Sequence, residues 1–246
     1  GIEELTAVDS KRPGLTFKQR RTLASLEQKA PILEAFVREE LRQCAQPLHF
    51  LSIATLTEPL PRFEAQRPWR QVPYAWGANT LHKDGRVETA SFSHADRTDP
   101  RIDFATTLAK QLEVGGTIVC WNDETLEDLR ALLEDLPTAK AAVRTIIGRQ
   151  HVDMMKLFDA GVFHPELRTH SDLEASVAVL LQDKSGAELA LHNEDDLREA
   201  IDKAAAPRIR STTKDKIASD MKAWVAWRSD RLLQLYRKFA DVPDTR

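Results

Sequence analysis

Cysteine, net charge and long apolar runs are all scarce in this chain of 246 residues. Its two cysteines, Cys44 and Cys120, provide neither a disulfide framework nor the spacing of a zinc site, so we expect a reducing, cytoplasmic setting. The net charge of −3 excludes a global basic field, and any binding of nucleic acid would depend on a local patch. No apolar run approaches the ~18 residues of a membrane span, and no signal peptide stands at the start, so we expect no membrane partner.

The composition is that of an ordinary globular protein, with 42% hydrophobic and 30% charged residues. A chain of this length buries a large core, either as one large domain or as one domain with a helical extension. Residues 1–20 are polar and become basic, which favours a linker, with a docking arm as the alternative. We therefore expect an N-terminal linker and helical extension over residues 1–46 and a main domain over residues 47–246.

Hydrophobic patterning predicts five strands, at residues 48–55, 74–82, 87–94, 117–121 and 150–154. The turn at residues 83–86 contains Gly85, which tolerates positive φ, and it predicts a hairpin between the second and third strands. Helical spacing predicts helices at 17–44 with a break at Pro31, and at 100–113, 124–135, 138–148 and 212–240. Residues 165–206 are expected to be rich in helix, with a loop at 184–186.

This order of elements predicts an α/β fold built on one mixed, five-stranded sheet. A three-strand meander comes first, and helix-linked strands follow, so helices flank the sheet on its faces. The order is suited to a ribonuclease-H-like sheet, with the first strand at its centre.

Several short motifs between residues 48 and 240 carry a resemblance to a known family. The most specific is Arg67-Pro68-Trp69 followed by Gln71-Val72-Pro73-Tyr74-Ala75-Trp76. With residues 47–55, 99–101, 119–122, 151–155 and 163–165, it resembles a bacterial domain of unknown function with the DnaQ-like, four-carboxylate exonuclease fold. The lead-in at residues 1–5 and 15–21 is similar to the segment that precedes this domain. The resemblance implies an exonuclease-like domain over residues 47–246, often preceded by a separate nuclease-like domain.

The chain departs from this family where the metal ligands would stand. On the first strand the family reads Asp-x-Glu, and this chain has Ser52 and Ala54. The second carboxylate motif does not align cleanly over residues 122–127, where Glu124 is the nearest acid. Asp230 on the last helix and Asp153 match best. The resemblance thus implies a vestigial pocket formed by Ser52, Ala54, Glu124, Asp153 and Asp230.

Two-metal cleavage of a phosphodiester requires carboxylates that hold two cations ~4 Å apart. A serine hydroxyl is a weak neutral ligand for Mg²⁺, and an alanine methyl is none. We therefore expect no catalytic residues, no bound metal and no cofactor. Mg²⁺ or Mn²⁺ belongs only to the alternative of a rearranged site built from Asp153, Asp230 and an acid of residues 123–127.

Basic and aromatic side chains supply candidate contacts to nucleic acid. Arg62, Arg67 and Arg70 lie in a proline-rich loop and are candidates for phosphate contacts, with ordinary surface charge as the alternative. Trp121 and Trp227 are candidates for base stacking, with a place in the core as the alternative.

Three functions from different classes follow from these observations. The first is a catalytically degenerate exonuclease-like domain that binds nucleic acid or acts as a scaffold within a nuclease-related protein. The second is an active metal-dependent nuclease with a rearranged carboxylate site. The third is a protein-interaction module, whose partner is another protein or an upstream nuclease-like domain. Metal-dependent cleavage separates the second from the others, and salt-sensitive binding of single strands separates the first from the third.

Overall fold

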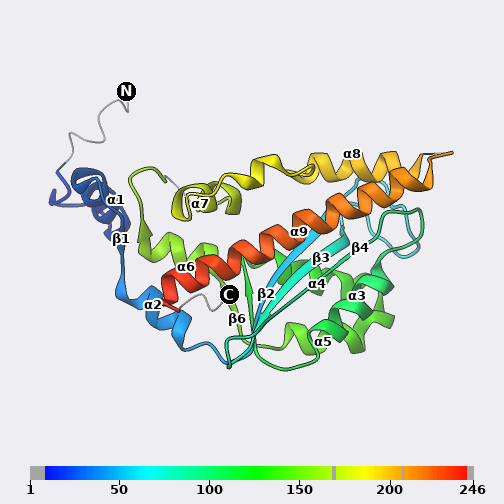
Figure 1. Ribbon diagram of the computed structural model, residues 1–246, viewed down its shortest axis with the longest axis horizontal. Coiled ribbons are helices and arrows are strands. Elements are labelled where there is room, and N and C mark those ends of the chain that lie inside the picture. Colours follow the sequence, from blue (N-terminus) through cyan, green and yellow to red (C-terminus); the bar gives the residue numbers. More distant parts are fainter. Residues whose placement is uncertain (1–8, 168–169, 207, 243–246) are drawn as a thin grey trace.

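A computed structural model describes residues 9–167, 170–206 and 208–242 (Figure 1). The lead-in motif at residues 1–5 lies outside the described residues. The five expected strands form one mixed sheet in the order β4-β3-β2-β5-β6, with the first expected strand, β2, at its centre. The prediction of a mixed five-stranded sheet is therefore confirmed. The strands are β2 (Leu48–Thr57), β3 (Gln71–Leu81), β4 (Val87–Ser93), β5 (Thr117–Cys120) and β6 (His151–Asp153).

The sheet combines an antiparallel meander with two parallel crossovers. β2 pairs antiparallel with β3, and β3 pairs antiparallel with β4 across the hairpin that contains Gly85. β2 then pairs in parallel with β5, and β5 in parallel with β6. The parallel strands β2 and β5 therefore end at the same edge of the sheet, which is where ligand sites of such sheets form.

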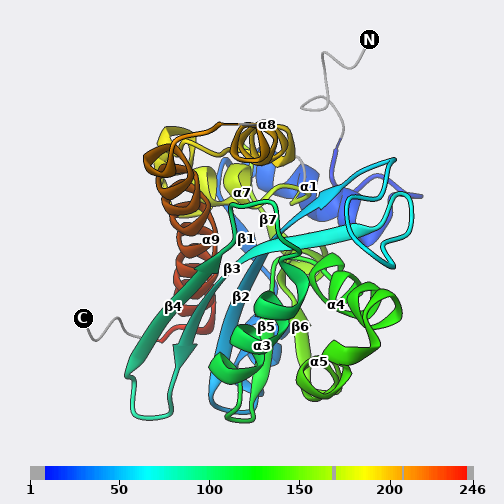
Figure 2. The same cartoon turned by 90° about the vertical axis from the view of Figure 1, so that its right-hand side faces the viewer.

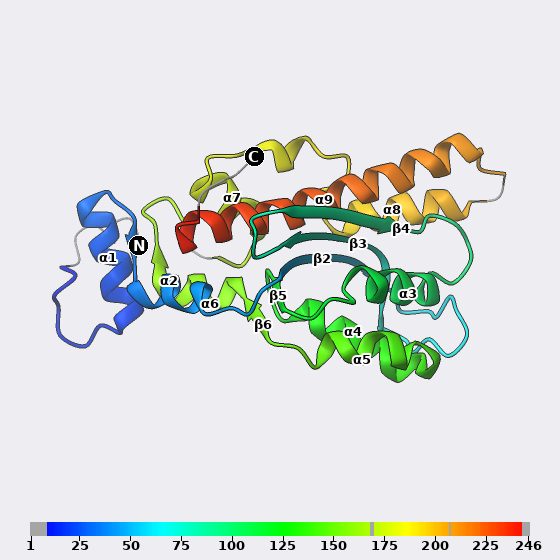
Figure 3. The same ribbon diagram turned by 60° about the horizontal axis from the view of Figure 1, so that its bottom comes forward.

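Helices cover both faces of the sheet, as expected. The long helix α9 lies on one face with α7 and α8, and α3, α4 and α5 cover the other (Figure 2, Figure 3). The main helices are α1 (Phe17–Gln28), α2 (Ala35–Arg42), α3 (Arg101–Gln111), α4 (Glu124–Asp135), α5 (Lys140–Ile147), α7 (Leu173–Leu180), α8 (Glu194–Ala205) and α9 (Ser211–Ala240). Among the described helices, none combines the length and the apolar surface needed to pass through a lipid bilayer.

Three local features differ from the expected elements. The expected strand at 150–154 is shorter, because the Asp153 carboxylate accepts a hydrogen bond from the Lys156 amide at 2.8 Å and starts helix α6 (Met154–Gly161). The expected break near Pro31 separates α1 from α2, but the residues between them also form a short strand, β1 (Ile32–Leu33), which pairs with β7 (Val162–Phe163). The expected loop at 184–186 is part of a 3-10 turn, η3 (Ser185–Glu188). A second 3-10 turn, η2 (Pro137–Ala139), precedes α5.

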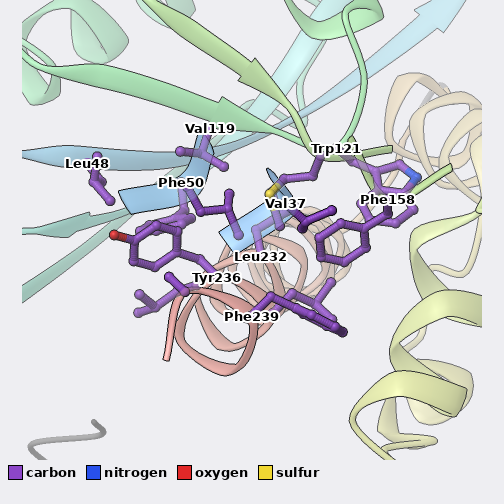
Figure 4. Packing of buried hydrophobic residues seen from close by; sticks show 14 of the residues in the cluster. Val37, Leu48, Phe50, Val119, Trp121, Phe158, Leu232, Tyr236 and Phe239 are labelled. Atoms are coloured by element: carbon purple, nitrogen blue, oxygen red, sulfur yellow. The ribbon is translucent and has the colours of Figure 1, made fainter. Parts of the chain in front are cut away.

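The segment before residue 47 contributes to the main core. Val37 and Leu41 of α2 are fully buried, and they belong to the same hydrophobic cluster as Phe50 of β2 and Phe158 of α6 (Figure 4). Phe158 packs against Phe239 near the end of α9, with ring centroids 4.7 Å apart. The boundary at residue 46 stays a prediction, although α2 packs into the core that it was expected to extend.

The backbone of α9 comes very close to the sheet at Gly77 of β3. A Cβ atom at this position would lie 2.3 Å from the backbone oxygen of Val225, which is much shorter than a van der Waals contact. Gly77 pairs with Ser52 on β2, so the helix backbone passes directly beside the central strand. Glycine at position 77 therefore sets how deeply α9 packs onto the sheet.

The substitution Gly77→Ala should destabilise the protein by about 3 kcal/mol, because α9 must move away to accept the methyl group. Gly115→Ala is the matched control, since nothing lies within 4 Å of the position that its Cβ would take, and it should change stability by less than about 0.5 kcal/mol. Urea unfolding followed by circular dichroism measures both. Equal stabilities of the two variants would contradict the close approach of α9.

Candidate functional site

The candidate site lies beside the second half of β2, just beyond the end of β5, between α4, α7 and α9. A small cavity of about 120 Å³ opens there beside Ser52, and we call it the β2 pocket. It is lined by Leu51, Ser52, Ile53, Thr55, Trp121, Asn122, Glu124, Thr125, Asp128, Leu173, Arg228 and Leu232. The structure thus brings together the end of the first strand, the start of α4 and one face of α9.

The two residues at which the resemblance implies carboxylates are both buried on β2. Ser52 is 5% exposed and Ala54 is 2% exposed. Ser52 lies opposite Gly77, and Ala54 opposite Ala75, in regular antiparallel register. A bulge follows between Ala54 and Thr55 and ends that register. The strand geometry of the expected motif is therefore present, but its side chains offer a divalent cation only one neutral hydroxyl.

On α9, one residue that faces this pocket is a cation, Arg228. Its guanidinium forms an ion pair with Glu174 of α7, and its Cζ lies 5.7 Å from the centroid of the Trp224 ring. Trp224, Arg228 and Leu232 are spaced four residues apart, so they share one face of the helix. Sequence reasoning missed Arg228, although this spacing from Trp224 was a signal that could have identified it.

The expected carboxylates are not gathered around Ser52. Asp230 is two residues from Arg228, about 200° around the helix, and it lines a different cavity with Asn79 and Arg86. Asp153 lies at the end of β6, two strands away from β2. There it caps α6 and accepts a hydrogen bond from the Asp123 amide at 3.2 Å. Of the three expected acids, only Glu124 lines the β2 pocket.

A larger cavity of about 660 Å³ adjoins the β2 pocket, and we call it the acidic cleft. The two cavities share Ile53, Thr55, Glu124, Asp128 and Arg228. Its lining adds Ala54, Trp69, Arg70, Gln71, Glu127, Ala131, Asp172, Glu174, His192, Asn193, Glu194 and Trp224. The walls of the cleft therefore carry more carboxylates than arginines. The carboxylates come from α4, α7, α8 and Asp172, which caps α7.

Asp128 is the titratable group most changed by this environment. Burial, followed by repulsion from Glu124 and Glu127, raises the pKa of Asp128 to about 7. A hydrogen bond from Thr55 opposes this shift. Asp128 therefore changes its charge near neutral pH. Glu124 and Glu127, the acids that repel it, line the same cleft.

Asp172 and Glu174 form a close acidic pair at the start of α7. The backbone amide of Glu174 donates to the Asp172 carboxylate at 3.0 Å, which caps the helix. Hydrogen bonding to Glu174 lowers the pKa of Asp172, whereas burial and the Asp172 carboxylate raise the pKa of Glu174. Arg228 opposes the rise at Glu174 and holds this acid at the wall of the cleft.

The three candidate arginines of the proline-rich loop all have acidic partners. Arg62 forms ion pairs with Glu58 and Asp202. Arg67 and Arg70 both pair with Glu134 and Asp135 near the end of α4. These pairs tie the loop to α4 and α8 and neutralise the charge that was expected to contact phosphates.

The two candidate tryptophans pack within the protein. Trp121 is 4% exposed, and its ring lies edge-on to Phe158 with centroids 6.1 Å apart. Trp227 is partly buried, and its indole Nε1 donates to Ser185 Oγ at 2.9 Å. Base stacking on either ring would require it to leave these contacts.

The residues of the β2 pocket do not fit a pair of divalent cations. Ser52 supplies only a neutral hydroxyl, and the guanidinium of Arg228 lines the pocket together with the carboxylates of Glu124 and Asp128. Across residues 9–167, 170–206 and 208–242, no group of three or more His, Cys, Asp or Glu side chains is arranged to hold a metal ion.

Comparison with known proteins identifies one family. Residues 49–171, half of the chain, match the model of a family described as Domain of unknown function (DUF2779). The match begins on β2 and ends just before α7. It therefore covers β2 to β7 and includes α4, which lines one side of the acidic cleft. No curated protein matches the chain.

The raised pKa of Asp128 makes stability depend on pH. Because its folded pKa is about 7 and its ordinary value is 3.8, ionisation opposes folding, and stability is lost as pH rises between those two values. Asp128→Asn lacks this ionisation, so its stability relative to the unmodified protein should increase by about 2–4 kcal/mol between pH 4 and pH 8. Urea unfolding across this range tests the effect, with Asp103→Asn, an exposed aspartate of α3, as the control. A difference that stays constant with pH would contradict the burial of Asp128.

Proposed function

The chain belongs to the DUF2779 family, and from the geometry of its β2 pocket we propose that it is a catalytically degenerate, exonuclease-like domain that binds a protein partner. The proposal combines an inherited nuclease frame with a cleft that has lost its ligands for metal. It takes the third of the functions considered above, the protein-interaction module, and places it on the fold expected for the first.

The sheet supports the exonuclease-like part of the proposal. The sheet begins with a meander of three antiparallel strands and continues with two parallel, helix-linked strands, and its first strand lies in the centre. This is the order expected for a ribonuclease-H-like sheet. The pocket also lies at the end of the first strand, where the resemblance implies the metal-binding carboxylates. We propose this fold identity on the order of the strands and on the place of Ser52 and Ala54.

The observation that carries the loss of catalysis is Arg228 in the β2 pocket. A divalent cation there would meet a guanidinium and would lack both carboxylates of β2. The attraction of two carboxylates is thus replaced by repulsion between like charges, which is strong at short range in a partly dry pocket. The guanidinium comes from α9 and is held by its ion pair with Glu174 of α7.

The charge of the cleft favours a protein partner over nucleic acid. Acidic side chains from α4, α7 and α8 line the cleft, and they repel the phosphates of a nucleic acid strand. The loop arginines that would offset this repulsion are already paired with Glu58, Glu134, Asp135 and Asp202. Binding of nucleic acid therefore becomes an outcome of the test below.

The proposal predicts that the protein neither cleaves nor tightly binds single-stranded DNA or RNA. Labelled oligonucleotides should stay intact with millimolar Mg²⁺ or Mn²⁺, and their binding should be weak and lost at moderate salt. Gel analysis and fluorescence anisotropy measure the two properties. Metal-dependent cleavage that is removed by Glu124→Gln or Asp128→Asn would establish the rearranged nuclease instead.

Restoring the lost carboxylates provides a second prediction. The triple variant Ser52→Asp, Ala54→Glu, Arg228→Asp should melt at a lower temperature than the unmodified protein, because like charges are brought together in a buried pocket. Added Mn²⁺ should recover part of the loss by binding only the folded state.

The isosteric control is Ser52→Asn, Ala54→Gln, Arg228→Asn, which should not respond to Mn²⁺. Thermal melts of both triple variants, with and without Mn²⁺, decide the question. An equal response of the two variants would mean that Ser52, Ala54 and Arg228 do not surround the former metal site.

A further inference from the structure

The first turns of α4 present three acids to the acidic cleft without a cationic partner. Glu124, Glu127 and Asp128 are spaced three and four residues apart, so they lie on one face of the helix. Among the described residues, no arginine or lysine forms an ion pair with any of the three. Other acids of the cleft do have such partners, since Glu174 pairs with Arg228 and Glu194 with Arg198. The α4 wall therefore has negative charge that the protein itself does not neutralise.

An aromatic ring stands at the rim of the same cleft. Trp69 is 69% exposed, yet its backbone amide donates to the carbonyl oxygen of Glu58 at 2.8 Å, which holds it in the left-handed region at φ 62°. A large exposed indole beside carboxylates that lack a cation offers a face on which a planar cation can stack. Arginine suits such a place better than lysine, because its guanidinium stacks on aromatic faces and bonds carboxylates in pairs.

Two buried polar atoms of the cleft also lack partners. Trp224 is 8% exposed, and its indole Nε1 has no acceptor among the described residues. Gln71, on the neighbouring wall, has a buried Oε1 for which the described part of the chain supplies no donor. Buried polar groups are almost always hydrogen-bonded, so each unpaired one calls for an explanation. Both residues line the cleft, so a peptide that moves these side chains on binding supplies a carbonyl oxygen for the indole N–H and an N–H for the amide oxygen.

From these observations we propose that the acidic cleft binds an arginine side chain within an extended segment of a partner protein. The guanidinium bonds the carboxylates of the α4 wall and stacks on Trp69, and the cavity of about 660 Å³ has room for the side chain and its flanking backbone. The inference rests on the proposed function, because it names the chemistry of the partner that the domain binds.

A labelled peptide tests the proposal on the full chain. The probe carries two arginines in a glycine and serine background, and its control carries citrulline, which keeps the shape of arginine without the charge. Fluorescence anisotropy should detect saturable binding of the arginine peptide and about tenfold weaker binding of the citrulline peptide. Equal binding of both peptides, or binding of neither, would refute the proposal.

Variants locate the binding. Glu124→Gln with Glu127→Gln should weaken binding of the arginine peptide about tenfold, whereas Glu39→Gln with Glu40→Gln, two exposed acids of α2, should leave it unchanged. Trp69→Ala should weaken binding about threefold to fivefold, whereas Leu60→Ala, an exposed apolar residue of the same loop, should not. Equal losses in the cleft variants and their controls would show non-specific attraction and overturn the proposal.

The outcomes distinguish this inference from the proposed function. If the peptide fails to bind and no oligonucleotide is cleaved, the arginine site is refuted while the non-catalytic function stands. If Mn²⁺ binds and the two α4 substitutions remove its binding, while the peptide does not compete, the acids form a metal site and the arginine site is refuted. Metal-dependent cleavage refutes the proposed function itself.

Discussion

The packing of α9 against β3 at Gly77 is the contact on which the rest of this structure depends. Because glycine has no side chain, the backbone of Val225 comes directly against the strand next to β2. The side chains of α9 on either side of this contact then have fixed directions. Trp224 and Arg228 reach the end of β2, and Leu232 joins the core that α2 and α6 complete. A side chain at position 77 would lift the helix and open the pocket that Arg228 occupies.

The position of α9 also determines the charge of the site. Arg228 enters the β2 pocket and pairs with Glu174, so one acid of α7 is neutralised from within the protein. The acids of α4 form no ion pair with this arginine, and burial with mutual repulsion raises the pKa of Asp128 to about 7. A single helix thus removes the conditions for two-metal chemistry at the end of β2 and leaves negative charge beside it.

Much of the fold was predictable, because periodicity is a local property of the sequence. Short apolar runs bounded by turn residues located the strands, and the Gly85 turn fixed the hairpin between β3 and β4. Helix α6 was missed, since the cap at Asp153 overrode an apolar run that resembles a strand. The two-residue strands β1 and β7 were missed as well, because their pairing depends on contacts between distant parts of the chain.

The site was predicted less well, for a related reason. The resemblance placed Ser52 and Ala54 correctly on the first strand, where both are buried; that they stand for lost carboxylates stays a prediction. On a helix, however, two residues change the direction of a side chain by about 200°, so Asp230 faces a different cavity and Arg228 faces the pocket. The meeting of acids from α4, α7 and α8 depends on tertiary packing alone.

Paramagnetic broadening by Mn²⁺ tests the central claim, that Arg228 has replaced metal at the end of β2, most directly. In amide NMR spectra of the unmodified protein with equimolar Mn²⁺, the signals of Ser52, Ala54 and Asn122 should keep the intensities of signals from remote parts of the sheet. Selective and saturable loss of these three signals would place a metal ion in the β2 pocket and contradict the account.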